Sequence, residues 1–335
     1  MRRELLVWSA FALLAACSGP QTMLAPAGEQ AQEIDVVWRT MLVVCGIMYA
    51  LVLAFLVWAL ARARRVLADG GPKMGHTANE RALERGLGAW IVLIVLGLAG
   101  LTATSFLVDA ALARNDPGPL RIRVTANQWW WAVDYPGSTP DQTIRTANEL
   151  HLPINRPALI ELRANDVIHS LWIPNLSGKR DLIPGRFNTL TITPRREGVY
   201  RAQCAEFCGL EHAYMSLDVH VHSSESFEAW KEHALAPGEA PSTPVEATGR
   251  DIFLRNACAL CHTIAGTRAQ GVTGPDLTHF AARRVIAGGV LPNTPEDLAS
   301  WIANPQAHKP GVNMPAVALS ANDMAALVAY LESLE

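Results

Sequence analysis

Residues 204–215 have the sequence CAEFCGLEHAYM, which places two cysteines, a histidine and a methionine on one short segment. Thiolate, imidazole and thioether groups form a soft ligand set that favours copper over hard cations. A one-copper blue site uses a single cysteine, so Cys204 and Cys208 together predict two metal ions that share bridging sulfurs. His212 and Met215 lie on the same segment, and the upstream His169 is flanked by apolar residues that could bury a site.

Two alternatives explain the cysteines alone. Cys204 and Cys208 could form a disulfide in an oxidising compartment. That pairing would leave His169, His212 and Met215 without a role. Zinc also binds cysteine and histidine, but methionine is a poor zinc ligand. Copper is therefore the prediction that uses every donor.

The sequence around this segment alternates apolar and polar residues. The alternation is clear at 120–124, 158–162 and 216–221, and Pro, Gly and Asn turns separate such stretches. Short alternating segments of this kind predict an all-β sandwich. About a hundred residues suit one such domain, and we place it at 119–223.

The composition excludes several classes of protein. The chain has 335 residues, of which half are apolar and only 18% are charged, against ~25% in typical soluble proteins. The net charge of −3 provides no basic field for nucleic acid, and the chain is too apolar to be disordered. A wholly cytosolic soluble enzyme is not expected.

Two charge-free runs precede the β domain. Residues 40–61 and 86–108 each reach the ~20 apolar residues that a membrane-spanning helix needs. We therefore predict an N-terminal flank and a two-helix transmembrane hairpin over 18–112. The segment between the spans holds six basic residues, and basic residues stay on the cytoplasmic side. Everything from Asp109 onward is then extracytoplasmic.

The first seventeen residues are typical of a bacterial export signal. Arg2 and Arg3 precede an apolar stretch that ends at Cys17. The sequence LAAC at 14–17 resembles a lipobox, in which the cysteine is lipidated. An uncleaved or differently cleaved signal with an incidental cysteine is the alternative, and both predict export of the flank.

The C-terminal part carries the sequence CALCH at 258–262, the C-x-x-C-H signature of haem attachment. Cys258 and Cys261 can each form a thioether to one porphyrin, and His262 then points at the iron. A zinc site would lack its second ligand pair. We place an all-α domain of the class I cytochrome c type at 247–335, after a linker at 224–246. The linker starts with a short amphipathic piece that holds Phe227 and Trp230, and its part at 234–246 is rich in Pro and small residues, as in a semi-extended tether.

Two further motifs support a haem-binding domain. The sequence GPDL at 274–277 resembles the class I cytochrome c turn, where a proline carbonyl orients the proximal histidine. Met314 supplies a thioether as the sixth iron ligand, and His/Met ligation suits electron transfer. A packing methionine is the alternative for Met314, and His279 is a rival ligand that we expect to be a surface residue. As in class I cytochromes c, which this part of the chain resembles, the final amphipathic helix should pack against the helix that carries Gly249 and Phe253.

These features together resemble subunit II of the haem–copper cytochrome c oxidases. The resemblance rests on the metal segment, on His169, on QWWW at 128–131 and on KRDLIPGR at 179–186, and it extends over about residues 35–230. With the C-terminal haem domain added, the chain resembles the caa-type subunit II, which has a cytochrome c fused to it. This resemblance implies a multidomain membrane protein with two transmembrane helices, a cupredoxin sandwich and a cytochrome c domain.

The resemblance also implies roles for the metal-segment residues. Cys204 and Cys208 would bridge the two coppers of a binuclear CuA centre. His169 and Met215 would complete the coordination of one copper. The second copper would be completed by His212 and the backbone carbonyl of Glu206.

Two more roles follow from the same resemblance. In the family, the side chain matching Glu206 also reaches a magnesium ion at the border with subunit I. Trp129 matches the tryptophan through which electrons enter, whereas core packing is the alternative for this aromatic run. The family often has a glutamate followed closely by tryptophan and proline before the second span, near a proton-uptake route. Here Arg85, Gly86 and Leu87 follow Glu84, so a solvated helix-end charge is expected instead.

The implied function is electron delivery in a bacterial inner membrane, with the copper and haem domains on the periplasmic side. Electrons would come from an external donor, such as a cytochrome c or a quinol:cytochrome c reductase, and pass through haem c and CuA to subunit I. Oxygen reduction and proton translocation would occur in subunit I, and subunit III is a further expected partner. The alternatives are a CuA-containing subunit of a nitric oxide reductase and, from another class, a copper chaperone or assembly factor. Quinol oxidase subunits lack the copper ligands present here.

Overall fold

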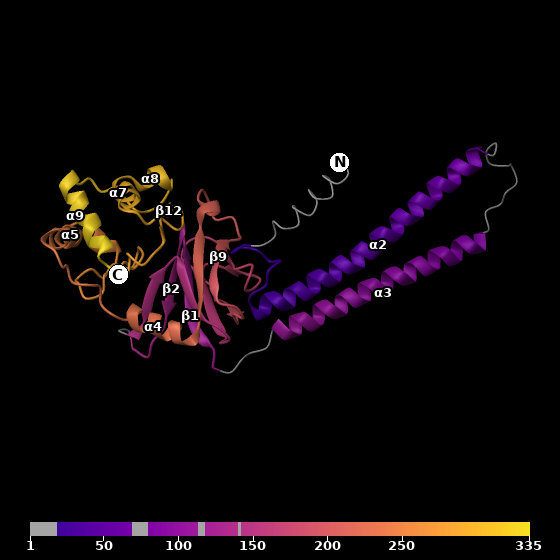
Figure 1. Ribbon diagram of the computed structural model, residues 1–335, viewed down its shortest axis with the longest axis horizontal. Coiled ribbons are helices and arrows are strands. Elements are labelled where there is room, and N and C mark those ends of the chain that lie inside the picture. The colour runs from indigo at the N-terminus through magenta and orange to yellow at the C-terminus, as the bar shows by residue number, and fades with distance from the viewer. Residues whose placement is uncertain (1–18, 69–79, 113–117, 140–141) are drawn as a thin grey trace, which may run out of the picture. The chain divides into compact units, whose positions relative to one another are not determined.

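The computed structural model describes residues 19–68, 80–112, 118–139 and 142–335 (Figure 1). The predicted export signal, with Cys17, lies outside the described residues. The chain divides into two compact units, one of residues 32–115 and one that combines residues up to Ala31 with residues 116–335.

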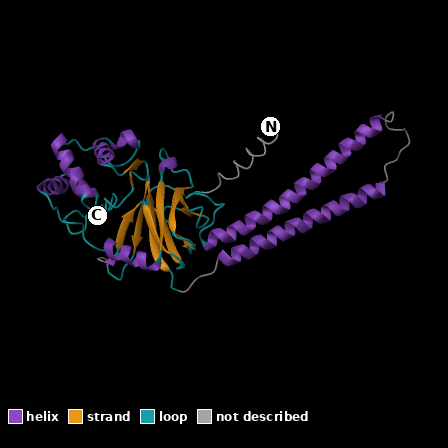
Figure 2. Ribbon diagram, viewed as in Figure 1, coloured by secondary structure: helices purple, strands orange, loops and turns teal. Residues whose placement is uncertain are grey.

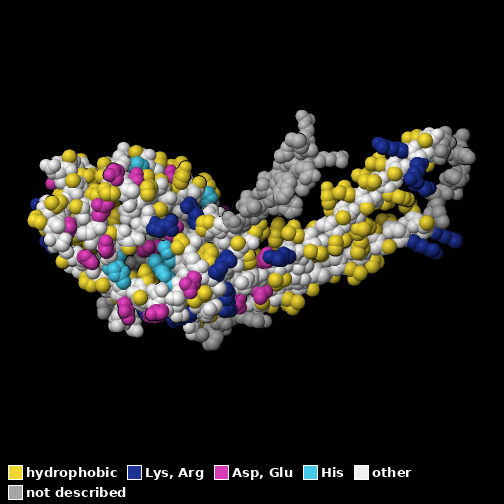
Figure 3. All heavy atoms as spheres, viewed as in Figure 1, with side chains coloured by type: hydrophobic (Ala, Val, Ile, Leu, Met, Phe, Trp, Pro, Cys, Tyr) yellow, Lys and Arg dark blue, Asp and Glu magenta, His cyan; other side chains and the backbone are white. Residues whose placement is uncertain are grey.

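The smaller unit consists of two long helices, α2 (Glu29–Ala68) and α3 (Glu80–Leu112). Both are long and apolar enough to cross a membrane, and apolar side chains cover their surface in Figure 3. Phe55 and Leu96, for example, are each 65% exposed, as expected for side chains that face lipid. The predicted runs lie inside these helices, which extend further at both ends. Glu84 is an exposed charge near the start of α3, as predicted.

The β domain is a sandwich of two five-stranded sheets, which confirms the predicted fold class (Figure 2). One sheet has the order β3-β2-β1-β5-β8 and the other the order β4-β10-β9-β6-β7. Strands β1 and β5 are parallel, as are β4 and β10, and the remaining pairs are antiparallel. The strands are β1 (Leu120–Asn127), β2 (Trp130–Tyr135), β3 (Ile144–Ala147), β4 (Glu149–Pro153), β5 (Ala158–Ala164), β6 (His169–Trp172), β7 (Lys179–Leu182), β8 (Asn188–Ile192), β9 (Gly198–Cys204) and β10 (Ser216–His222).

The predicted alternation explains the core of the sandwich. Along β1 every second residue is buried, so Val124 faces inward while its neighbours are partly exposed. Trp131, Leu162, Leu171 and Val219 come from both sheets and are fully buried between them. The core therefore lies between two inner faces, as sheet-on-sheet packing requires.

A segment before α2 also belongs to the β domain, which the sequence did not predict. The backbone N–H of Ala27 donates to the carbonyl of Asn175 at 2.6 Å, and the Ala27 side chain is part of the sandwich core. A Cβ added to Gly28 would lie 2.3 Å from the carbonyl oxygen of Leu176. Only a glycine permits this close backbone approach.

The predicted linker at 224–246 is mostly ordered structure. Helix α4 (Ser224–Ala234) packs on the sandwich through Phe227, which is 1% exposed, and Trp230. Helix α5 starts at Pro244, after a capping box between Thr243 and Glu246. Only residues 235–243 are left as a connection. The amphipathic piece expected around Phe227 and Trp230 is this helix, and the connection is a little shorter than the predicted tether at 234–246, because the capping box starts α5 at Pro244.

The C-terminal domain is helical, with a short ribbon added. Its elements are α5 (Pro244–Arg255), α6 (Cys258–Cys261), β11 (Val285–Ile286), β12 (Leu291–Pro292), α7 (Pro295–Ala303), α8 (Pro305–His308) and α9 (Ala321–Glu332). As predicted, α9 packs against α5, where Phe253 meets Tyr330 edge to face at 6.3 Å. A Cβ on Gly249 would lie 1.9 Å from the carbonyl oxygen of Ala326, so the glycine sets how closely the helices cross.

Candidate metal centres

The metal segment connects two neighbouring strands at one end of the sandwich. Cys204 ends β9, and Met215 immediately precedes β10. The backbone N–H of Cys204 donates to the Met215 carbonyl at 3.0 Å, which closes the base of the loop. His169 begins β6, the strand that pairs with β9 on its other side. The sheet therefore brings an upstream histidine next to the loop.

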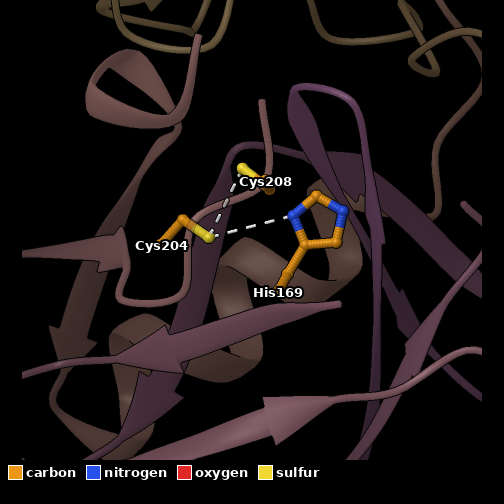
Figure 4. A group of neighbouring side chains, drawn as sticks. All are labelled: His169, Cys204 and Cys208. Atoms are coloured by element: carbon orange, nitrogen blue, oxygen red, sulfur yellow. Dashed lines mark hydrogen bonds between the residues drawn. The ribbon is translucent and has the colours of Figure 1, made fainter. Parts of the chain in front are cut away.

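The predicted donors meet at one point. Figure 4 shows Cys204, Cys208 and His169 pointing toward one another. The two sulfurs lie 3.7 Å apart. The remaining donors lie around the two sulfurs. His169 Nδ1 is 3.8 Å and the Glu206 carbonyl oxygen is 3.1 Å from Cys204 Sγ. His212 Nδ1 is 3.6 Å and Met215 Sδ is 3.9 Å from Cys208 Sγ.

The two thiols are buried, and a positive charge beside them would stabilise their thiolate forms. The hydrogen bond between the sulfurs lowers the pKa of Cys204 and raises the pKa of Cys208, because two thiolates this close repel each other. A cation between them would stabilise both thiolates. The donor set of two thiols, two imidazoles, a thioether and a carbonyl therefore fits copper.

His169 is oriented by a carboxylate that sequence reasoning missed. Its Nε2–H donates to Asp166 Oδ1 at 2.8 Å, which leaves the lone pair of Nδ1 directed toward Cys204. Burial by itself lowers the pKa of His169, but Cys204 and Asp166 together raise it. A carboxylate that fixes the tautomer in this way is a common partner of metal-binding histidines. The only signal in the sequence for this role of Asp166 was its position three residues before His169.

Trp129 lies directly against the metal segment. Its indole Nε1–H donates to the backbone carbonyl of Cys208 at 2.9 Å, and the Gln128 side chain donates to the same oxygen at 2.8 Å. Trp129 is 5% exposed. Glu206 and Phe207, by contrast, are exposed, and the Phe207 side chain is 77% exposed. The carboxylate of Glu206 is therefore accessible from outside this chain.

The haem-attachment segment is arranged as a proximal ligand site. Cys258 and Cys261 are the first and last residues of α6, and His262 follows directly. The Nδ1–H of His262 donates to the Pro275 carbonyl at 2.7 Å, so the lone pair of Nε2 is available to an iron. Burial lowers the pKa of His262, which favours the neutral ligand form. A Cβ on Gly274 would lie 2.7 Å from the imidazole ring.

The sixth-ligand candidates differ in their surroundings. Met314 is half-buried and packs against the haem-domain core. The two ring nitrogens of His279 face backbone carbonyls, Nδ1 that of Glu335 at 2.7 Å and Nε2 that of Ala236 at 3.2 Å. His279 is therefore already engaged, in keeping with the expected non-ligand role.

A buried lysine joins the haem domain to the copper domain, and no sequence signal indicated it. Lys309 is 2% exposed, and its ammonium donates to the carbonyls of Trp129 at 2.8 Å and Ala287 at 2.9 Å. Two residues later, a Cβ on Gly311 would lie 3.1 Å from the far edge of the Trp129 indole. Trp129 is thus enclosed between the metal segment and the loop at 309–311.

Comparison with known proteins gives consistent matches. A family model described as cytochrome c oxidase subunit II, periplasmic domain, matches residues 138–222, and a cytochrome c model matches residues 246–335. Cytochrome c oxidase subunit 2 of Alkalihalophilus pseudofirmus is 34% identical over 332 residues, which cover 96% of this chain and 94% of that protein. The protein of the same name from Bacillus subtilis is 30% identical over 346 residues, with the same coverage of 96% and 94%.

A solved structure is also similar to part of the chain. The periplasmic domain of subunit II of cytochrome oxidase of Bradyrhizobium japonicum is 28% identical, with a TM-score of 0.33. The match covers 37% of this chain and 96% of that one.

Proposed function

Since this chain belongs to the cytochrome c oxidase subunit 2 family and carries a cytochrome c domain, we propose that it delivers electrons from its own haem c to its own copper centre and on to subunit I. The chain is then the oxidoreductase component at which electrons enter a haem–copper oxidase. Oxygen reduction and proton translocation take place in subunit I.

The copper site of this proposal uses the six donors of the metal segment and β6. When bound, the copper pair and the haem c each carry one electron at a time. Cys204 and Cys208, whose sulfurs lie 3.7 Å apart, would both hold the copper pair as thiolates. His169 with Met215 and His212 with the Glu206 carbonyl would supply the remaining ligands. Burial of the sulfurs keeps water from the site.

The haem site uses residues of the C-terminal domain. Cys258 and Cys261 hold the porphyrin through thioether bonds, and His262 binds the iron through Nε2. The Pro275 carbonyl keeps the imidazole in that orientation. Met314, which packs against the same core and lies on the loop before α9, would supply the second protein ligand to the iron.

The position of Trp129 is the observation that carries this proposal. Its indole contacts the metal segment through Cys208 O on one side and faces Gly311 on the other. Gly311 lies three residues before Met314, and Val312 packs against the sandwich core. A path of packed protein atoms therefore connects the proposed haem ligand to the proposed copper ligand. Lys309 holds this loop against Trp129.

The exposed apolar side chains of the metal segment suggest where subunit I binds. Phe207, Leu210 and Tyr214 are 77%, 78% and 56% exposed, respectively. Large exposed apolar side chains beside a functional site are typical of a protein interface. The exposed Glu206 lies among them, so its carboxylate can bind a magnesium ion at the border with subunit I.

The proposed location is a bacterial inner membrane, which α2 and α3 span. The copper and haem domains lie on the periplasmic side, as the description of the matching family model indicates. Subunit III and an external donor, a cytochrome c or a quinol:cytochrome c reductase, complete the proposed partners. Oxygen rather than nitric oxide is the proposed final acceptor, and gas uptake by the assembled complex distinguishes the two.

The test is Trp129→Phe in the assembled oxidase, with Trp130→Phe as the control. Trp130 is the half-buried neighbour in the same aromatic run, and it begins strand β2 of the sandwich. The haem c is reduced by a light pulse, and the electron is followed to copper by absorbance. We expect about tenfold slower transfer in Trp129→Phe, with copper and haem contents unchanged, and wild-type transfer in Trp130→Phe. An unchanged rate in Trp129→Phe would contradict the proposed path.

A further inference from the structure

A group of histidines on β4 and β10 lies outside the copper and haem sites. The two strands are parallel neighbours, with Glu149 opposite Asp218 and His151 directly opposite His220. Residues two apart on a strand share a face, so His222 joins the same side as His220. Histidine side chains gather on the face shown in Figure 3. The sheet register thus groups these side chains.

Their atoms are close enough to share one ion. One donor atom from each of Glu149, His151 and His220 lies within 4.8 Å of the others. Glu149 Oε2 is 3.6 Å from His151 Nε2. Two ligands of a tetrahedral zinc ion at ~2.1 Å are ~3.4 Å apart. That pair is already at nearly the required separation. The His220 ring now stacks on His151 at an interplanar angle of 8°, so it would turn out of this stack to direct a nitrogen at the same ion.

His151 is a buried group with an unused nitrogen. The residue is 6% exposed, and its Nε2 has no hydrogen-bond partner although it faces Glu149. Its Nδ1 lies 2.8 Å from His222 Nε2. Stacking holds the ring between His220, at 4.7 Å between centroids, and Trp230, at 4.0 Å. An unpaired buried imidazole nitrogen costs free energy, and a bound cation would remove that cost.

The protonation states suit a cation. Burial by itself raises the pKa of Glu149, but His151, Arg283 and Thr146 outweigh it and lower the pKa to about 2. Burial lowers the pKa of His222 to about 4 and also lowers the pKa of His220. Near neutral pH Glu149 is therefore a carboxylate and His220 and His222 are neutral, which are the forms that bind metal.

The two oxygens of Glu149 have different partners. Oε1 accepts from the Thr146 hydroxyl and lies 3.8 Å from Arg283 Nε. Oε2 faces His151 and remains available. The Arg283 guanidinium weakens the attraction for any cation but does not occupy Oε2. A single carboxylate with two imidazoles favours a zinc-like ion over Mg²⁺ or Ca²⁺, which need more oxygen ligands.

A cavity beside these three side chains provides space for the ion and a fourth ligand. It has a volume of about 120 Å³ and is lined by Glu149, His151 and His220 of the sandwich and by Asp276 and Arg283 of the haem domain, among others. A water molecule takes ~30 Å³, so the cavity holds an ion together with a water as its fourth ligand.

We propose that Glu149, His151 and His220 bind one divalent transition-metal ion of the zinc class, separately from the copper centre. His222 accepts the Nδ1–H of His151, which directs the lone pair of His151 Nε2 toward the ion. Such an outer hydrogen bond typically fixes the tautomer of a metal-binding histidine. The site does not depend on the proposed electron path.

The test uses the full chain with its copper and haem already loaded, so that the sulfur site is occupied. Zn²⁺ binding is measured by titration and by metal analysis after dialysis. Co²⁺ serves as a second probe, because its visible absorption reports a near-tetrahedral nitrogen and oxygen site. We expect one tightly held ion in the wild-type chain.

The variants are His220→Ala, Glu149→Gln and His222→Ala, with His308→Ala as the matched control. His308 is a histidine of the haem domain whose Nε2 contacts Ser300. Loss of an outer partner weakens metal binding about tenfold or more, so His222→Ala should lose about tenfold and the two ligand variants at least as much. His308→Ala should bind as the wild type does.

Two results would overturn the proposal. One is a wild-type chain that retains no more Zn²⁺ than Glu149→Gln, and the other is an equal loss of affinity in His308→Ala. Copper and haem spectra check that each variant is folded, and Glu149→Gln preserves the shape of the side chain in case His220→Ala is unstable. Electron transfer should stay unchanged throughout, which separates failure of this proposal from failure of the proposed function.

Discussion

The indole of Trp129 donates a hydrogen bond to the backbone carbonyl of Cys208 at 2.9 Å. On its other side the same residue accepts a hydrogen bond at its backbone carbonyl from Lys309 of the haem domain, at 2.8 Å. One residue therefore contacts both the proposed copper loop and the domain that carries the haem signature. The effects that we expect of substitutions at Lys309, Asp166 and Met314 depend on these two contacts of Trp129 or on the proposed metal ligands on either side of it.

Lys309→Met should change how stability depends on pH. Burial lowers the pKa of Lys309 to about 8, from an ordinary value of 10.5. Because the folded-state value is the lower one, the unfolded chain binds more protons between about pH 8 and 10.5. The free energy of unfolding of the wild type should therefore rise through that window, relative to the variant, by on the order of 1–3 kcal/mol.

Denaturant unfolding of the detergent-solubilised chain at several pH values measures this difference. Lys231→Met is the control, since Lys231 is 45% exposed and pairs only with Glu228. A wild type and a Lys309→Met variant with parallel pH profiles would show that Lys309 is not buried in solution.

Asp166→Asn should weaken copper binding. The carboxylate accepts from His169 Nε2, and an amide that presents its N–H₂ there would disturb the tautomer that leaves Nδ1 free. The expected loss is about 10- to 100-fold in copper affinity, measured by competition with a copper chelator. Asp181→Asn, a substitution on β7, should bind copper normally, and equal affinities in all three proteins would refute the role of Asp166.

Met314→Leu should keep the haem attached but remove the sixth ligand. The covalent bonds to Cys258 and Cys261 do not involve Met314, so haem content is expected to be unchanged. The methionine-to-iron absorption band should disappear and the reduction potential should fall, because a thioether ligand raises it. Met324→Leu, which alters a half-buried methionine on α9, serves as the control. Retention of the band in Met314→Leu would exclude Met314 as the ligand.

Gly249→Val should destabilise the haem domain. Any Cβ at this position meets the Ala326 carbonyl at 1.9 Å, so α5 and α9 would have to separate. Overpacking of this kind costs about 1–3 kcal/mol, which thermal unfolding followed by haem absorbance can detect. Thr248→Ala changes an exposed residue of the same helix and should leave the unfolding temperature nearly unchanged. Equal unfolding temperatures for Gly249→Val and the wild type would contradict the close helix crossing.

The parts of the fold that could be predicted depend on short-range patterns. Alternation along β1 and β10 placed two strands, and the CALCH motif with the GPDL turn placed His262 beside the Pro275 carbonyl. The six metal donors were also named from residue chemistry and from the resemblance. Such patterns are visible in a sequence because each involves neighbours along one strand, helix or loop.

The parts that could not be predicted depend on long-range packing. Lys309 reads as a surface lysine, and only the docking of its loop on Trp129 makes it buried. The group formed by Glu149, His151 and His220 exists because β4 and β10 are parallel neighbours, although they are far apart along the chain. Helix α4 is different, since Phe227 and Trp230 at helical spacing already indicated an amphipathic piece before the Pro-rich tether.

The central claim is that this chain holds two coppers and one haem c as a single relay. Copper and iron analysis of the purified full chain, combined with the copper EPR spectrum, tests it most directly. We expect two coppers per iron and hyperfine structure from one electron shared between both coppers. One copper per iron, or a spectrum of an isolated copper ion, would contradict it.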